Sequence, residues 1–322
     1  MTPRNEPAAG VHVYGPVPSR RLGFSLGVDI LPRKTCTLDC IYCQLGRTHR
    51  TTARRGRYFP PGRIVAQVKK AVESGKRIDH ITFSGSGEPT LNADLGKIIR
   101  DIKIMTDIPI AVLTNGTLLS RADVRRDLLA ADLVVPSLDA VTPGLFARVN
   151  RPGPGLDVEA MVGGLEKFRR DFKGKIWLEI MLVKGINDSP AHLRKLRTAA
   201  GRIKPDRIHL NTVVRPPAEK EARPLSFTEM EKIRAFFGPA AEIAAHLAPE
   251  KQTEIPEEAE AAIIAMAGRR PVTAEDIAVS LGKQADEVLK ILGRLLDRKE
   301  ISSVRHKNRV YYKRPLKRPP SS

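Results

Sequence analysis

The sequence predicts an α/β protein built on a parallel sheet and followed by a small second domain. Short apolar runs rich in β-branched residues alternate six times with amphipathic helical patterns, which is typical of successive βαβ units. A polar joint that contains proline, HLAPEKQTEIPEE, ends this alternation near residue 250. Three helical patterns and one hairpin pattern follow the joint.

Six apolar runs have the length and composition of buried strands, and they cover residues 26–31, 80–85, 108–116, 133–139, 176–183 and 207–214. Each is followed by a segment whose apolar residues repeat with a helical period, over residues 63–76, 94–104, 121–130, 156–172, 189–203 and 226–238. Right-handed crossovers between such strands permit a barrel, a partial barrel or a doubly wound sheet. In all three, functional groups gather at the carboxyl ends of the strands.

The segment after the joint has the element order of a winged-helix domain. Helices are predicted over residues 258–268, 273–282 and 285–300, and residues 301–314 alternate about a turn at Lys307 and Asn308. We therefore predict an α/β domain over residues 1–250, a winged-helix domain over 251–316 and a disordered basic tail over 317–322.

Composition points to a protein with a substantial core that works in a reducing compartment. Hydrophobic residues make up 41% of the 322 residues. No apolar run approaches the ~20 residues of a membrane span, and the first residues lack the apolar stretch of a secretory signal. With three cysteines that cannot all pair, these features predict a cytoplasmic protein without membrane contact.

The formal charge is +19, and two acid-free segments concentrate it. The first, residues 44–57, contains Arg47, Arg50, Arg54, Arg55 and Arg57. The second, residues 301–322, contains Arg305, Lys307, Arg309, Lys313, Arg314, Lys317 and Arg318. These segments either bind a polyanion or are solvated basic faces that accompany an arginine-rich composition.

A third group of basic residues lies on the last predicted helix. Lys290, Arg294 and Arg298 follow one another at intervals of four residues, so they share one helical face. In a winged-helix domain this would be the recognition helix, and the face would contact phosphates. A solvated basic stripe is the alternative.

All three cysteines lie within CTLDCIYC, directly after the first predicted strand. Cys36, Cys40 and Cys43 can hold zinc if Asp39 or His49 supplies a fourth ligand, or if the site keeps an open position. Alternatively they can hold an iron–sulfur cluster of four irons, with one iron left without a protein ligand. Three inert buried thiols would be unusual at this density. The spacing favours the cluster.

The motif resembles the CxxxCx(aromatic)C signature of the radical S-adenosylmethionine (radical SAM) superfamily, with Tyr42 as the aromatic residue. The resemblance covers roughly residues 14–240 and implies a partial (β/α)6 barrel. It implies that the three thiolates bind a four-iron–four-sulfur cluster and that S-adenosylmethionine (SAM) chelates the fourth iron. One electron from a flavodoxin or ferredoxin type of donor would then cleave SAM to a 5′-deoxyadenosyl radical, an oxidoreductase chemistry that abstracts hydrogen.

The segment SGSGEPT, residues 84–90, resembles the GGE element that holds the SAM amino group in this superfamily. Ser86 stands where the first glycine is usual, and we expect its backbone rather than its side chain to matter. No Lys-Ser/Thr pair follows, so a P-loop is not supported. The resemblance implies cofactor contacts by Tyr42, Ser86, Gly87, Glu88, Asn115 and Ser137; Asp139 is an additional candidate that loop capping would equally explain.

Five further residues are candidates for contact with the substrate: Arg20, Arg21, Glu179, Lys184 and Asn211. The two arginines precede the first strand and suit a carboxylate or a phosphate, although a surface pair is the alternative. Glu179 lies in the middle of an apolar strand, so it should face a polar interior or form a buried ion pair.

The stretch from YGPVPSRRLG into the cysteine motif resembles a radical SAM subgroup grouped with the wyosine-base tRNA-modifying enzymes. With the basic segments and the winged helix, this predicts a substrate that is tRNA or another nucleic acid. A protein or peptide substrate is the alternative, because winged-helix modules also recognise peptides. A redox-sensing DNA-binding regulator is the third hypothesis, and the SAM-like segments argue against it.

Overall fold

The computed structural model describes residues 10–19, 21–48, 51–244 and 259–315. Eight strands form one sheet whose spatial order is the order of the sequence. They are β1 (Val13–Ser19), β2 (Gly23–Val28), β3 (His80–Phe83), β4 (Ile110–Thr114), β5 (Leu133–Pro136), β6 (Lys175–Leu182), β7 (Arg207–Thr212) and β8 (Ala241–Ile243). β1 and β2 are antiparallel, and the later neighbours are parallel. The predicted partial barrel is confirmed.

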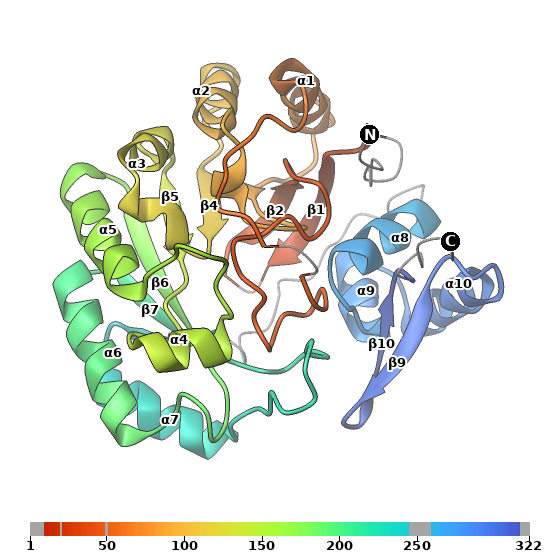
Figure 1. Cartoon of the computed structure of the whole chain (residues 1–322). Helices are drawn as coiled ribbons and strands as arrows, with labels where there is room; N and C mark the ends of the chain where they lie inside the picture. Colours follow the sequence, from red (N-terminus) through yellow and green to blue (C-terminus); the bar gives the residue numbers. More distant parts are fainter. Residues whose placement is uncertain (1–9, 20, 49–50, 245–258, 316–322) are drawn as a thin grey trace, which may run out of the picture.

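Helices cover the outer face of the curved sheet (Figure 1). They are α1 (Pro61–Val72), α2 (Leu95–Met105), α3 (Ala122–Leu128), α4 (Pro143–Val149), α5 (Val158–Asp171), α6 (Pro190–Ile203) and α7 (Phe227–Phe237), with short 3-10 turns at Pro89–Leu91 and Thr117–Ser120. Alternate strand residues such as Ile81 and Leu178 pack against helix residues such as Ile98 and Leu196 in the main core. Because side chains alternate across a strand, the other strand residues face the barrel interior.

Three elements of the barrel were not predicted. The strand β1 has the sequence VYGPVPS, and its two prolines and its glycine are read as loop signals because proline cannot donate to a strand ladder. It lies at the edge of the sheet, where its pairing with β2 shifts register between Tyr14 and Val17. The other two, α4 and β8, are too short for a periodic pattern to stand out.

The amino end of the barrel interior is closed by the turn between β1 and β2. Leu22 from this turn packs in a separate apolar cluster with Ala111, Leu133, Val135 and Trp177 from three other strands. His209 on β7 lies beside Trp177, with 5.2 Å between the ring centroids. Its side chain is 1% exposed, and burial, with the charge of Arg21, lowers the pKa of His209 to about 4.

The buried imidazole of His209 makes the barrel sensitive to acid. The unfolded chain protonates this group below pH 6.5, whereas the folded chain resists protonation until about pH 4, so stability falls between these values. Between pH 7.5 and 4.5, we expect His209→Phe to lose roughly 3 kcal/mol less free energy of unfolding than the wild type does. The measurement is urea unfolding of the metal-free protein at both pH values. His12 and His192 titrate in both proteins, so the difference isolates His209. An equal loss of stability in the variant would contradict the assignment.

The segment after the barrel forms a small unit with its own core. Its elements are α8 (Ala259–Arg269), α9 (Ala274–Leu281), α10 (Ala285–Asp297), β9 (Ser302–His306) and β10 (Arg309–Lys313). Residues from all three helices and from β10 share one apolar cluster, including Ile263, Ile277, Leu292 and Tyr312. Three helices before a hairpin is the predicted order. The winged-helix assignment stays a prediction, and the predicted boundary at 250 and the tail over 317–322 lie outside the described residues.

The C-terminal unit contacts the barrel beside β1 and beside the stretch between β2 and α1 that holds the cysteines, here called the cysteine segment (Figure 1). Val17 of β1 packs against the apolar cluster of the unit. The guanidinium of Arg33 donates to the carbonyl oxygen of Gly268 over 3.1 Å. The hydroxyl of Tyr311 donates to the carbonyl oxygen of Val214 over 2.8 Å. The two parts therefore meet at the carboxyl ends of the barrel strands.

Among the residues that the structure describes, every helix is too short or too polar to cross a membrane.

Candidate functional site

The three cysteines lie in a long segment between β2 and α1, at the carboxyl end of β2. Each sulfur is half-buried and has one nitrogen donor nearby. Asn115 Nδ2 is 3.6 Å from Cys36 Sγ, Asn150 Nδ2 is 3.4 Å from Cys40 Sγ, and Lys34 Nζ is 3.3 Å from Cys43 Sγ. The three sulfurs thus face donors from three different parts of the chain, and such donors stabilise thiolates.

The donor set fits an iron–sulfur cluster. Burial raises the pKa of Cys36 to about 12 and the pKa of Cys40 well above its ordinary value, and a bound metal would favour the thiolates by taking up their negative charge. Within the described parts of the chain, no three His, Cys, Asp or Glu side chains are arranged around one metal ion. A four-iron cluster does not require that arrangement, because each cysteine binds a different iron.

The segment 84–90 is in direct backbone contact with the start of the cysteine segment. The amide of Lys34 donates to the carbonyl oxygen of Ser86 over 2.6 Å, and the amide of Glu88 donates to that of Thr35 over 3.0 Å. A Cβ atom on Gly87 would overlap the Thr35 carbonyl oxygen. Gly87 is therefore required for the two segments to approach each other, which gives this predicted cofactor residue a structural role.

Ser86 is held by its side chain as well as by its backbone, contrary to our expectation that only the backbone matters. Its hydroxyl donates to Asp29 Oδ2 over 2.6 Å, and its amide reaches the same oxygen at 3.2 Å. Asp29 directly follows β2 and is nearly buried. The Ser86 side chain therefore ties the segment after β3 to the end of β2.

Glu88 is buried, and its carboxylate joins the ends of β3 and β4. Oε1 accepts hydrogen bonds from the amide and hydroxyl of Thr90 and from the hydroxyl of Thr114. Among the described residues, Oε2 accepts a single hydrogen bond, from the amide of Asn115 over 2.6 Å. Burial raises the pKa of Glu88, and these hydrogen bonds oppose that rise. A carboxylate oxygen accepts about two hydrogen bonds, so Oε2 keeps capacity for one more donor.

Asn115, a predicted cofactor residue, lies next to the cysteine segment. Its side-chain amide donates to Thr37 Oγ1 over 2.7 Å as well as facing Cys36. Its side-chain oxygen accepts from the amide and hydroxyl of Thr117. Glu88, Asn115 and Thr37 thus form one connected chain of hydrogen bonds that leads to the first cysteine.

Tyr42 belongs to a second polar network, centred on Asp139 after β5. The Tyr42 hydroxyl and Asn150 Nδ2 both donate to Asp139 Oδ2, and the amide of Met181 donates to Oδ1 over 2.9 Å. Burial raises the pKa of Asp139 to about 6. Since Asn150 also faces Cys40, this network holds the middle of the cysteine segment.

Asn150 was missed by sequence reasoning, and Asp139 was only an additional candidate. Asn150 ends the unpredicted helix α4, and nothing in VNRPG marks it as a site residue. Ser137 is half-buried at the end of β5, in a bridge with Glu179. Its hydroxyl makes no hydrogen bond within the described residues, so it is open to a ligand.

Three of the five substrate candidates come together inside the barrel. Glu179 on β6 forms an ion pair with Arg21 and accepts a hydrogen bond from Asn211 Nδ2 over 3.1 Å. Burial disfavours the charged carboxylate, but Arg21 outweighs burial and lowers the pKa of Glu179. The buried ion pair that was the alternative for Glu179 is therefore present, although all three side chains remain partly exposed.

The other two candidates do not join this group. Lys184 is 48% exposed and pairs with Glu229 at the start of α7, with Nζ 2.9 Å from Oε1. Its side chain therefore forms a surface ion pair, and its role in substrate contact stays a prediction. Arg20 lies outside the described residues.

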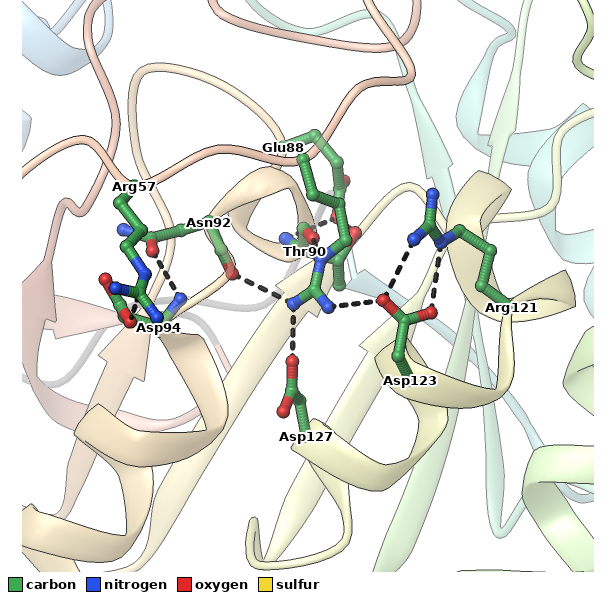
Figure 2. A network of polar contacts seen from close by, with 9 residues as sticks. Arg57, Glu88, Thr90, Asn92, Asp94, Arg121, Asp123 and Asp127 are labelled. Atoms are coloured by element: carbon green, nitrogen blue, oxygen red, sulfur yellow. Dashed lines mark hydrogen bonds and ion pairs between the residues drawn. The ribbon is translucent and has the colours of Figure 1, made fainter.

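Much of the basic segment 44–57 is neutralised. The guanidinium of Arg55 donates to the carboxylates of Asp123 and Asp127 and to the backbone oxygens of Thr90 and Asn92. Figure 2 shows these four partners gathered in one polar network. In addition, Arg57 pairs with Asp94 and Arg47 pairs with Glu219. Arg55 thus holds the cysteine segment in place, whereas Arg47 and Arg57 keep exposed side chains and Arg54 is exposed without an ion pair among the described residues, so polyanion binding by this segment stays a prediction.

Residues 30–196 match the model of the Radical SAM superfamily. The chain is 42% identical over 288 residues to a protein named GTPase Obg from Brachyspira hyodysenteriae, and the match covers 88% of this chain and 42% of that protein. It is 38% identical over 226 residues to the UPF0026 protein MJ1312 of Methanocaldococcus jannaschii, and this match covers 70% of each chain.

A solved structure of TYW1 with a lysine-pyruvate adduct bound has a similar fold, with a TM-score of 0.53 and 18% identity. The similarity covers 73% of this chain and 78% of that one. At this identity the likeness concerns the fold, and it agrees with the partial barrel described above.

Proposed function

This chain belongs to the radical SAM superfamily, whose members use a four-iron–four-sulfur cluster and SAM, and from that premise we propose that Cys36, Cys40 and Cys43 hold the cluster. When bound, these cofactors would supply reductive cleavage of the sulfonium S–C5′ bond, with one electron from an external flavodoxin or ferredoxin type of donor, and so the means to abstract hydrogen from a substrate. The observation that supports the cysteine assignment is the convergence of a nitrogen donor on each of the three sulfurs.

We infer the roles of the residues around the cysteines from the hydrogen bonds that they make and from those that they could still make. Oε2 of Glu88 can accept one more hydrogen bond, which suits the ammonium group of SAM. The Ser137 hydroxyl is half-buried and open to a ligand at the same ends of the strands. Tyr42 and Asn115 orient the cysteine segment through Asp139 and Thr37. The group of Arg21, Glu179 and Asn211 lies deeper and offers polar contacts to the substrate.

We propose further that the substrate is an RNA, and the hairpin β9–β10 is the surface that supports this. Its side chains Arg305, Lys307, Arg309 and Lys313 are exposed, and none has an ion pair among the described residues. By contrast, Arg294 and Arg298 on α10 both pair with Glu260 of α8. The basic face of the predicted recognition helix is thus partly neutralised, although Lys290 stays exposed, and the hairpin is the more strongly basic surface.

The hairpin is connected to the cysteine segment through the loop after β7. Tyr311 at the base of the hairpin bonds to Val214, and the same loop continues to Glu219, whose amide donates to the carbonyl oxygen of Ile41 over 2.9 Å. An RNA whose phosphate backbone binds the hairpin would therefore lie on an element that is connected by hydrogen bonds to the cysteine segment. The resemblance to wyosine-type enzymes selects tRNA as the first RNA to test.

We expect the variant R305Q/K307Q/R309Q/K313Q to bind unfractionated tRNA about tenfold or more weakly at moderate salt. The slope of log Kd against log salt concentration should fall by roughly 3, because about four phosphate contacts are removed. Binding is measured by fluorescence anisotropy at four salt concentrations, and SAM cleavage without RNA should stay at the wild-type rate.

The matched control is K70Q/K167Q/K195Q/K232Q, which removes the same charge from exposed positions on the barrel helices. We expect it to bind tRNA nearly as the wild type does. Equal weakening in both variants would show that only the net charge matters, and wild-type binding by the hairpin variant would overturn the RNA surface. Preference for an acidic peptide over tRNA would favour the protein-substrate alternative.

A further inference from the structure

The helix α8 of the C-terminal unit ends against the strands that carry the cofactor segments. Its last residue, Arg269, places its guanidinium over the ring of Tyr14 on β1, with Cζ 3.6 Å from the ring centroid. At this distance the cation and the aromatic face attract each other. The contact is made by a side chain that is itself largely buried, so it is part of the packing between the two units.

Tyr14 in turn contacts β2 and the residue that directly follows β3. Its ring lies on Gly27 of β2, where any Cβ atom would overlap the ring. Its hydroxyl shares a hydrogen bond of 3.2 Å with the hydroxyl of Ser84. Ser84 is the first residue of the segment 84–90, so the aromatic ring lies between Arg269 and the base of that segment.

Arg269 also acts on Asp29, the carboxylate that holds Ser86. Burial raises the pKa of Asp29, and the positive charge of Arg269 is among the influences that oppose this rise. An ionised Asp29 is the better acceptor for the Ser86 amide and hydroxyl. The carbonyl oxygen of Ser86 in turn accepts the amide of Lys34, so the connection extends from α8 to the cysteine segment.

A second contact reaches the cysteine segment directly. Arg33 donates to the carbonyl oxygen of Gly268, near the carboxyl end of α8, where the helix dipole attracts a cation. Arg33 is followed by Lys34, whose ammonium group faces Cys43. The end of α8 therefore contacts residues that lead into both cofactor segments.

We propose that Arg269 is a positioning residue for the cofactor site, and that the C-terminal unit completes this site by bracing the segments at 29–36 and 84–90. This role is independent of the RNA-binding role of the hairpin. It predicts that SAM binding depends on Arg269, although no described side chain of the C-terminal unit forms a hydrogen bond or ion pair with the proposed cluster ligands or SAM ligands.

The test is Arg269→Gln in the full-length chain. We expect SAM to bind the cluster-loaded protein roughly tenfold more weakly, as is typical when a residue that orients ligand-bearing groups is lost. We also expect faster amide hydrogen exchange in residues 27–36 and 84–90 of the metal-free protein. Arg269→Lys, which keeps the charge over Tyr14, should recover a substantial part of both properties.

Arg270→Gln is the matched control, because it removes the same charge from the adjacent residue and should leave both properties at the wild-type level. tRNA binding should be unchanged in all three variants, which separates this proposal from the role of the hairpin. If exchange and SAM affinity are unaltered in Arg269→Gln, or altered equally in Arg270→Gln, the proposal is overturned. Should Arg269→Gln unfold the C-terminal unit in thermal melts, Tyr14→Leu provides the same test from the barrel side.

Discussion

Cys40→Ala is expected to leave the protein, after anaerobic reconstitution, without most of its iron and sulfide and without cleavage of SAM to 5′-deoxyadenosine. A four-iron cluster held by three thiolates loses a third of its protein ligands in this variant, and Asn150 loses the sulfur that it faces. Iron and sulfide are measured chemically, and the reduced cluster by electron paramagnetic resonance.

Gln44→Ala is the control, because Gln44 follows the last cysteine and its side chain has no hydrogen bond within the described residues. It should bind a full cluster. A complete iron and sulfide load in Cys40→Ala would refute the assignment of the cysteines. Loss of the cluster in Gln44→Ala as well would mean that the segment tolerates no change and that the test must be repeated at Cys36 and Cys43.

Gly87→Ala is expected to lower the rate of SAM cleavage about 100-fold, since displacements near 1 Å in a reacting site have effects of this size. The added methyl group meets the carbonyl oxygen of Thr35, which is backbone and cannot rotate away. The segment 84–90 and the start of the cysteine segment must therefore separate. We expect a loss of about 2 kcal/mol in the free energy of unfolding as well.

Gly144→Ala is the matched control for this substitution. Gly144 lies in α4, and a Cβ atom there meets nothing within 4 Å. Alanine at this helical position should leave SAM cleavage unchanged and stabilise the protein slightly. Wild-type cleavage by Gly87→Ala would show that the contact between the two segments is not needed for the reaction.

The strands and most helices of the barrel could be predicted because each carries its own periodic pattern. The strand β1 could not, because its prolines and glycine are compatible with a strand only at the edge of a sheet, a position that local sequence does not report. The residues of the site likewise divide into those that local sequence predicts and those that it does not. Cysteine spacing and the GGE-like segment are local signals, whereas Asn150 acquires its role only when α4 is placed beside Cys40.

The basic residues show why charge counts alone were ambiguous. Arg55 and Arg305 lie in segments that are equally free of acids, yet Arg55 bonds to two aspartates from α3, and Arg305 is exposed on the hairpin. The acids that neutralise the first segment lie tens of residues away in the sequence. Ion pairs of this kind depend on the fold, so only the structure separates the supporting arginines from those that can meet a polyanion.

The bonds of Arg55 have a consequence for how the protein acquires and keeps its inorganic cofactor. Arg55 fastens the end of the cysteine segment to α3 and to the backbone after β3, and no cysteine side chain takes part in these bonds. Small zinc domains, by contrast, fold only when the metal arrives. Because these bonds do not involve the cysteines, we expect the loop to keep its shape without the cluster, so that a delivery protein could hand over a finished cluster and a chain damaged by oxygen could be repaired by replacement of its iron and sulfide.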